Sequence, residues 1–386
     1  MALEEPVTRL HFDPASDRIA LALRRLRAAY NRRPGEDVPV VEIDVAAPIM
    51  TTQETLGDLD RMLERAAAWA NHLAATDNDW PPAIIGYCTV AMIPEAFGCE
   101  VVFHPGQSPW ARHAVRDIAD VWKLRPCRVG DSPMIRREFE WIDYFQRKLG
   151  TAVPMWTPDI QSPFSVAAQI VEPEELLAAC VTDPKAVHHI CGMVTDFLIE
   201  WMSATLPRIE NPGFPGANFP CIPENIGLCM ADDTPLIMLS PAMYEEFALP
   251  YNCRIGEAFG GIHVHCCGDY RHNLDNLLRI TNVRSIQVHG GPGEFPLPET
   301  ADADDPFNRA RRRLTVFVDT NEVARGGAYK GRYREHYAEY VLPRLRRGDM
   351  TGIILQSCGC AEGAGLDAVN DALRWTRAQL AEEAIG

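Results

Sequence analysis

The sequence lacks any apolar run long enough to cross a membrane. No stretch approaches the roughly 18 consecutive apolar residues that a spanning helix needs. The opening residues, MALEEPVTRLHFDP, also lack the apolar core of a secretory signal peptide. These two absences predict a cytoplasmic protein that does not use a membrane as a partner.

Positive charge is also scarce. The 386-residue chain has 37 lysines and arginines against 53 aspartates and glutamates, which gives a formal net charge of −16. Nucleic acids and anionic membranes both require a positive face on their protein partners. The charge therefore argues against nucleic acid as a partner and favours a small molecule or another protein.

No strand-like segment is followed by the Gly-x-Gly-x-x-Gly turn of dinucleotide-binding sheets. Buried strands are instead predicted at seven places, which alternate with helical segments: 38–45, 83–87, 226–232, 261–267, 283–289, 314–320 and 351–358. Asp183-Pro184 and Ser240-Pro241 have the N-cap and first-turn proline of helix starts. This alternation predicts an α/β fold, a (β/α)8 TIM barrel, which often runs to this length around a single core.

The sequence divides into an N-terminal helical extension, residues 1–37, and a barrel catalytic domain, residues 38–386. The helical pattern of the extension indicates packing or oligomer contacts, such as those of a homodimer. Segments 204–224 and 289–311 are rich in proline, glycine and aspartate, so we expect them to form loops over the mouth of the barrel.

Twelve cysteines in a cytoplasmic chain are expected to be reduced thiols, and eight of them lie scattered where cysteine behaves as a small apolar residue. The other four form two tight pairs. The first lies in GGIHVHCCGD, residues 260–269. Because side chains alternate across a strand, His263, His265 and Cys267 share one face and Cys266 lies on the other. His265 and Cys267 are the predicted zinc ligands, with His263 a deeper core residue and Cys266 a helix-packing residue.

A catalytic zinc ion needs a third protein ligand and keeps one position open. The second pair, in ILQSCGCAEG, supplies it, with Cys358 at a strand end and Cys360 in the following loop. Thiolate ligands bring negative charge, which lowers the Lewis acidity of zinc but still allows a bound substrate thiol to ionise. The alternative is a set of buried thiols with no metal.

Together, ADDTPLIMLSPAMYEEFALPYNCRI, GGIHVHCCGD and GIILQSCGCAEGAGLDAVNDALRW resemble the uroporphyrinogen decarboxylase superfamily, especially its cobalamin-dependent methyltransferases. The shared pattern is an acidic pair, a Ser-Pro helix start, a His-x-Cys-Gly strand end and a late cysteine. The late cysteine corresponds to Cys358, since seven residues then separate it from Leu366. The resemblance implies a barrel enzyme that uses zinc to move a methyl group between a corrinoid (cobalamin) and a small-molecule donor or a thiol or folate-type acceptor.

Within that superfamily the decarboxylases resemble this chain less. Their arginine-rich N-terminal stretch grips the propionates of a porphyrinogen, whereas the corresponding VEIDVAAPIMTTQETLGD has no arginine. Another alternative is a non-catalytic corrinoid or metal carrier. The chain lacks the Asp-x-His-x-x-Gly motif by which corrinoid domains ligate cobalt. The corrinoid is therefore expected on a separate protein or free in solution.

Other polar residues are candidates for the same site. Asp232 and Asp233 end a strand and are the predicted catalytic pair, able to orient a metal ligand, bind substrate or supply a proton; alternatively, Asp233 belongs to the helix turn at Thr234-Pro235. Gln161, Ser162 and Asp319 are the predicted substrate-binding residues, and Glu322 is a weaker candidate.

Overall fold

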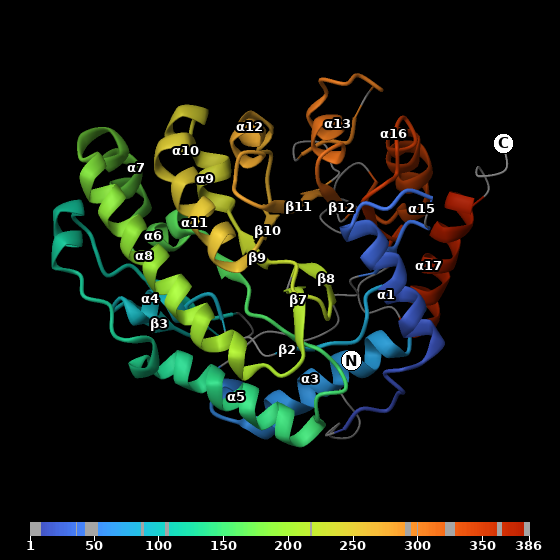
Figure 1. The fold of residues 1–386 in the computed structure, drawn as a ribbon, viewed down its shortest axis with the longest axis horizontal. Coiled ribbons are helices and arrows are strands. Elements are labelled where there is room, and N and C mark those ends of the chain that lie inside the picture. Colours follow the sequence, from blue (N-terminus) through green and yellow to red (C-terminus); the bar gives the residue numbers. More distant parts are fainter. Residues whose placement is uncertain are drawn as a thin grey trace.

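The computed structural model describes residues 9–35, 37–42, 53–85, 89–104, 108–216, 218–289, 295–298, 300–320, 329–360 and 365–381. Its centre is a ring of mostly parallel strands surrounded by helices (Figure 1). The chain is thus an α/β protein with the (β/α)8 barrel fold that the alternation of elements predicts.

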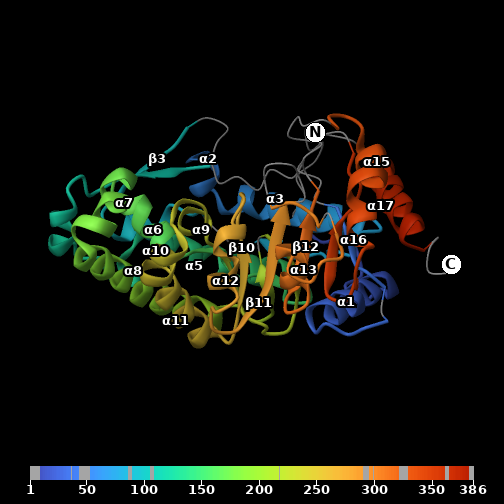
Figure 2. The same ribbon diagram turned by 90° about the horizontal axis from the view of Figure 1, so that it is seen from above.

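Seven strands form the larger sheet, in the order β1-β13-β12-β11-β10-β9-β6. Their bounds are β1 Val40–Val41, β6 Ile160–Gln161, β9 Leu228–Ala231, β10 Ile262–His265, β11 Val283–His289, β12 Thr315–Asp319 and β13 Ile353–Gln356. Every neighbouring pair in this sheet is parallel. Figure 2 shows β10, β11 and β12 side by side.

The ring continues through β5 (Met155–Trp156), which pairs with β2 (Ile84–Ile85), before the chain bends into β6. Between β2 and β1 the described residues form no strand ladder. Side chains join these edges instead: Val40 N donates to Asp79 Oδ2 at 2.9 Å, and Asn78 Nδ2 donates to the Glu42 carbonyl at 2.6 Å. Each of the seven predicted segments contains an observed strand, although residues 43–45 and 86–87 lie outside the described part of the chain. Strands β5 and β6 belong to the ring and were missed by the sequence pattern.

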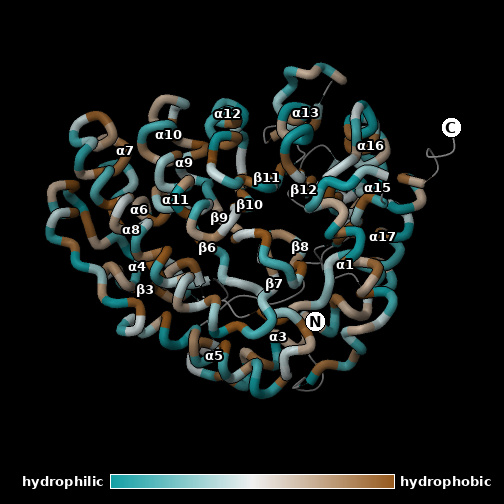
Figure 3. Tube along the Cα trace, in the orientation of Figure 1, coloured by the Kyte–Doolittle hydropathy of each residue, from teal (hydrophilic) through white to brown (hydrophobic). Residues whose placement is uncertain are grey.

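The helices lie outside the strands, and hydrophilic and hydrophobic residues alternate along them (Figure 3). The predicted start of α8 is confirmed, with the Asp183 carboxylate accepting from Ala186 N at 3.2 Å, and that of α10 likewise, with Ser240 Oγ accepting from Met243 N at 3.3 Å. The helix bounds are α1 Asp17–Tyr30, α2 Gln53–Leu56, α3 Leu59–Ala74, α4 Met92–Ala96, α5 Pro133–Leu149, α6 Pro163–Ile170, α7 Pro173–Thr182, α8 Pro184–Thr205, α9 Asp233–Met238, α10 Pro241–Phe247, α11 Leu249–Phe259, α12 Leu274–Leu277, α13 Pro306–Arg311, α15 Tyr333–His336, α16 Leu342–Leu345 and α17 Leu366–Ala381.

Strand alternation separates two layers of buried side chains. Outward residues such as Val264 and Val288 pack in the large cluster under the helices. Inward residues such as Phe317 and Ile354 form a second cluster inside the ring, together with residues of α1. Helix α1 thus packs against the amino ends of the strands, and the division at residue 37 stays a prediction. None of the helices among the described residues is long and apolar enough to cross a membrane.

The prediction of a mouth loop at 204–224 is wrong. Residues Pro212–Gly216 form β7, which runs parallel to β5, and Phe219–Ile222 form β8, its antiparallel partner. Phe219 lies in the inner cluster and the two strands lie near the centre of the ring (Figure 1). The hairpin therefore fills the inside of the barrel.

In the other predicted loop, 289–311, the last six residues form α13. A second antiparallel pair, β3 (Glu100–Val102) and β4 (Trp110–Arg112), lies outside the ring.

Candidate metal centre

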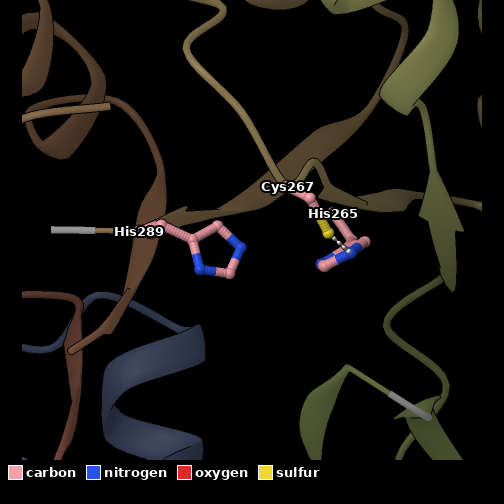
Figure 4. Close-up of side chains that lie close together, drawn as sticks. All are labelled: His265, Cys267 and His289. Atoms are coloured by element: carbon pink, nitrogen blue, oxygen red, sulfur yellow. Dashed lines mark hydrogen bonds between the residues drawn. The ribbon is translucent and has the colours of Figure 1, made fainter. Parts of the chain in front are cut away.

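Three potential metal ligands meet where β10 and β11 end. The ligand atoms of His265, Cys267 and His289 all lie within 4.8 Å of one another. Figure 4 shows the His289 ring facing the His265–Cys267 pair from the neighbouring strand. This position is the carboxyl end of the strands, where (β/α)8 enzymes build their active sites. The structure thus brings together two of the three predicted ligands and adds a histidine.

His265 and Cys267 are directly hydrogen-bonded, with 3.1 Å between His265 Nε2 and Cys267 Sγ. Burial lowers the pKa of His265, but the contact with Cys267 and the charge of Asp233 outweigh it and raise that pKa to about 9. Hydrogen bonds from His265 and His289 lower the pKa of the Cys267 thiol to about 7. The pair therefore favours a thiolate, the form in which cysteine binds a metal.

A chain of polar contacts fixes the two imidazoles. Nδ1 of His265 lies 2.6 Å from Oε1 of Gln287, so that ring nitrogen donates to the amide oxygen. Nε2 of Gln287 donates to Oδ2 of Asp319 at 3.0 Å, and Nδ1 of His289 lies 3.3 Å from the same oxygen. His265 is thus held at Nδ1 by an amide, and Nδ1 of His289 faces a carboxylate; metal-binding histidines commonly use such groups as orienting partners. Asp319, predicted to contact substrate, supports the ligands in this structure.

The two predicted catalytic aspartates have different surroundings. Oδ1 of Asp233 accepts from Cys267 N at 2.6 Å, which fixes the backbone that carries the thiol. Asp232 is fully buried, and its Oδ2 accepts from Tyr244 at 2.5 Å and Asn252 at 3.0 Å. Burial raises the pKa of Asp232 to about 7 although these hydrogen bonds lower it. Asp233 therefore lies in the site, whereas Asp232 joins the end of β9 to α10 and α11.

Cys358 is not brought into the group. It is buried, and its Sγ lies 3.8 Å from the carbonyl oxygen of Ala372 in α17. Burial raises the pKa of its thiol to about 11. Strand alternation would point Cys358 inward with Gln356, but β13 ends at Gln356 and Gly359 has a φ of +81°. Cys360 packs beside Val40 and Val369. Metal binding by Cys358 stays a prediction, and His289 is a second candidate for the third ligand.

The remaining candidates lie along β6. Gln161 alternates with Ile160, which packs under the helices, so the side chain of Gln161 is on the inner face. Ser162 is the N-cap of α6, and its Oγ accepts from Ser165 N at 3.3 Å. Glu322 lies outside the described residues. The interpretations of His263 as a core histidine and of Cys266 as a packing residue are confirmed, since both are fully buried and Cys266 lies in the outer cluster.

Sequence reasoning missed His289, Gln287 and Asp159. The first two follow Ser285 at two-residue intervals, so a row of polar residues on one face of β11 was the available signal. Asp159 is buried, and its Oδ2 accepts from Asn218 at 3.0 Å at the end of the hairpin. Burial raises the pKa of Asp159 to about 6, and the charge of nearby His265 opposes that shift. The sequence feature that could have indicated Asp159 is its position as the single acidic residue of the short segment TPDIQS.

The donor set fits a zinc ion. Zinc prefers imidazole nitrogen and thiolate sulfur, and three protein ligands leave a position for substrate. Bond lengths of 2.0–2.3 Å in a tetrahedral site place donor atoms about 3.3–3.8 Å apart. The three ligand atoms here lie within 4.8 Å of one another, so small rotations of the side chains would bring them to these distances.

Comparison with known proteins identifies the family and the fold of the chain. The family model for uroporphyrinogen decarboxylase (URO-D) matches residues 74–291. A uroporphyrinogen decarboxylase of Xanthomonas oryzae pv. oryzae is 31% identical over 180 residues, which are 45% of either chain, and one of Xylella fastidiosa is 27% identical over the same length. The chain thus matches about half the length of these curated relatives. A solved methyltransferase from Methanosarcina mazei shares the fold, with a TM-score of 0.62 and 18% identity over 93% of this chain and 98% of that one.

Proposed function

Because the chain belongs to the uroporphyrinogen decarboxylase family, we propose that it is a zinc-dependent methyltransferase of that family, which moves a methyl group between a small molecule and a corrinoid. The observation that carries the proposal is the His265–Cys267–His289 group at the carboxyl ends of β10 and β11. A porphyrinogen decarboxylation has no use for such a set of soft and nitrogen donors, whereas thiol or methyl-donor activation does.

Bound to these ligands, zinc supplies Lewis acidity that ionises a substrate thiol or polarises a methoxy or methylthio donor. The protein groups keep the donors in place around it. Asp233 holds the backbone of Cys267 at 2.6 Å, and Gln287 holds the ring of His265 at 2.6 Å. With Nδ1 of His265 held by Gln287 and Nδ1 of His289 facing Asp319, the Nε2 atoms of both rings would be the ones to hold the metal.

The inner face around this group offers two further functional side chains. Gln161 ends β6 on the inner face, and we assign it a polar contact with the substrate. Asp159 has a pKa raised by burial to about 6, so it is able to exchange a proton near neutral pH. In this proposal, Gln161 orients the small molecule and Asp159 holds or releases a proton beside it.

The corrinoid is proposed to arrive on a separate protein, because the sequence has no cobalt-ligating Asp-x-His-x-x-Gly motif. To test the proposal, the protein is purified without added metal and its zinc content is measured by mass spectrometry. About one zinc per chain is expected. Methyl transfer is then followed by cobalt absorbance, with reduced and methylated cobalamin and a panel of thiols and methoxy compounds. Absence of any bound transition metal contradicts the proposal.

Decarboxylation of uroporphyrinogen is the second candidate, because the curated relatives carry that name. The missing arginines of VEIDVAAPIMTTQETLGD and the net charge of −16 both disfavour a polycarboxylate substrate. Incubation with uroporphyrinogen at neutral pH distinguishes the two functions. We expect no appreciable coproporphyrinogen, and rapid conversion would favour the decarboxylase.

A further inference from the structure

A second cavity lies at the opposite end of the strands from the metal centre. It has a volume of about 300 Å³ and is lined by Arg32, Arg311, Arg312 and Arg347, with Asp349 the one carboxylate among the lining residues. Arg311 and Arg312 precede β12, and Arg347 and Asp349 precede β13. The cavity therefore faces the amino ends of these strands, beside α1 and α13.

The four guanidinium groups are fixed by backbone carbonyls. Arg32 donates to the carbonyl of Leu314, and Arg311 donates to that of Leu345 at 3.0 Å. Arg312 donates to the carbonyl of Asn308 at 3.0 Å, and Arg347 donates to that of Pro298 at 3.3 Å. Each of these contacts uses one of the five N–H donors of a guanidinium, so most donors remain for another partner.

None of the four has a carboxylate partner among the residues that the structure describes. Elsewhere in this acidic chain arginines commonly have one: Arg309, on the same helix α13, pairs with Asp275, and Arg279 pairs with Glu245. Asp349, inside the cavity, accepts two hydrogen bonds from Thr351, at 2.9 Å and 2.8 Å. The cavity thus concentrates four cations without a direct ion pair to any described residue, although the charge of Asp349 acts on Arg32 and Arg311 and that of Asp305 acts on Arg311.

Burial adds a cost for two of these four cations, Arg32 and Arg311, whereas Arg312 and Arg347 are exposed to solvent. Arg311 is 6% exposed, and it lies so close to the backbone that a Cβ added at Gly348 would meet its Nη2 at 1.6 Å. Burial lowers the pKa of both Arg32 and Arg311, with charges such as that of Asp349 opposing the shift. A bound anion would offset the cost of placing these charges away from water.

We propose that this cavity binds an anion with two phosphate groups, such as a nucleoside diphosphate or pyrophosphate. Guanidinium groups bind phosphate oxygens in pairs, and four of them around one cavity exceed what a single phosphate engages with good geometry. The binding is independent of the methyl-transfer proposal, because the cavity shares no residue with the metal centre.

The test is calorimetric titration of the purified protein with inorganic pyrophosphate at fixed ionic strength. Saturable binding of one pyrophosphate per chain is expected, tighter than that of inorganic phosphate. Arg312→Gln and Arg347→Gln should each weaken it by about tenfold, the usual effect of losing one charge-assisted contact. Both side chains are exposed, so these variants are expected to fold, and a thermal melt without ligand checks this.

Arg309→Gln is the matched control, since it removes a cation from the same helix but one that pairs with Asp275 outside the cavity. Its affinity should equal that of the unmodified protein. The proposal is overturned by an absence of saturable pyrophosphate binding, or by equal weakening in Arg309→Gln and the two cavity variants. Tighter binding of citrate than of pyrophosphate would also overturn the assignment to phosphate.

Discussion

Two histidines on the inner face of β10 show how depth in the barrel determines the behaviour of one residue type. His263 is fully buried, with Nδ1 2.5 Å from Ser285 Oγ and Nε2 3.0 Å from the carbonyl of Ile226. Burial lowers its pKa to about 3. His265, two residues later, contacts Cys267 and Gln287, and its pKa is raised to about 9 although burial lowers it.

The difference lies in what each ring nitrogen meets. His263 Nε2 donates a hydrogen bond to the carbonyl of Ile226, and the Ser285 hydroxyl donates to Nδ1, so the neutral ring is completely satisfied. The Nε2 of His265 instead meets a thiol that ionises readily. Along the inner face of β10, a structural layer at His263 is therefore followed, two residues later, by a reactive layer at His265 and Cys267.

The largest expected effect comes from removing the thiol of the reactive layer. Cys267→Ala should lose its metal and at least about 1,000-fold in methyl transfer, since zinc at this site has few protein ligands. Cys266→Ala, one residue away but in the outer cluster, should keep the metal and lose about 1–2 kcal/mol of stability. Zinc content and thermal melts of both variants check this. Metal loss from Cys266→Ala alone would mean that the inward-facing assignments on β10 are wrong by one residue.

The next effect concerns the third ligand. His289→Ala should empty the site if the present arrangement holds the metal, because His289 is the third member of the group. Cys358→Ala should do so if zinc draws that thiol away from Ala372, as the family resemblance implies. Zinc content and the sulfur signal in X-ray absorption of the unmodified protein, one or two sulfur ligands, discriminate between them. A Cys360→Ala variant should keep its zinc and serves as the control.

A smaller effect is expected from the partner that orients His265. Gln287→Leu removes the contact to Nδ1 of His265 and the link to Asp319 while keeping the volume similar. Loss of such an orienting group usually weakens metal binding by about 10–100-fold. Competition with a chelator of known affinity measures the change. Unchanged affinity would show that His265 is held in place by packing alone.

The smallest expected effect concerns the structural layer. His263→Phe keeps an aromatic ring beside Tyr30 and Phe219 but leaves Ser285 and the Ile226 carbonyl without their partner. We expect a loss of about 1–3 kcal/mol in the free energy of unfolding, from denaturant titration, with zinc content unchanged. Loss of zinc in a folded His263→Phe protein would remove the distinction between the two layers.

The same contrast explains what the sequence revealed. Strands with apolar runs, such as β12 and β13, were predicted because burial on both faces gives a continuous signal. Strands β5 and β6 were missed because Pro158 interrupts the segment between them, whereas β1 and β2, which are equally short, lie in mainly apolar segments. Strand β7 of the hairpin has the sequence PGFPG, which is typical of a loop, and its pairing with β8 depends on packing inside the ring.

In the site, alternation was sufficient for His265 and Cys267, which lie on one element. Cys358 was assigned from its place at a strand end and from the family resemblance, and its metal binding stays a prediction, because in this structure the thiol faces α17 after the end of β13. Neither His289 nor Gln287 is marked by spacing from Cys267 along the chain. Their proximity depends on the pairing of β10 with β11, which places residues about 22 positions apart side by side. The expected cytoplasmic location, homodimer and separate corrinoid protein stay predictions.

The hairpin β7–β8 also limits how substrates and products reach the metal ligands inside the barrel. Its inner residue Phe219 and the α1 residues Leu26 and Ala29 occupy one cluster below the metal centre, so the described residues leave the carboxyl end as the route to the ligands. A reagent and its product must then enter and leave through the same opening. For the proposed methyl transfer, this geometry predicts that the small molecule binds first, deep in the barrel. The bulky corrinoid then binds over it at the carboxyl end. Product release then waits for the corrinoid to depart, which favours an ordered over a random kinetic scheme.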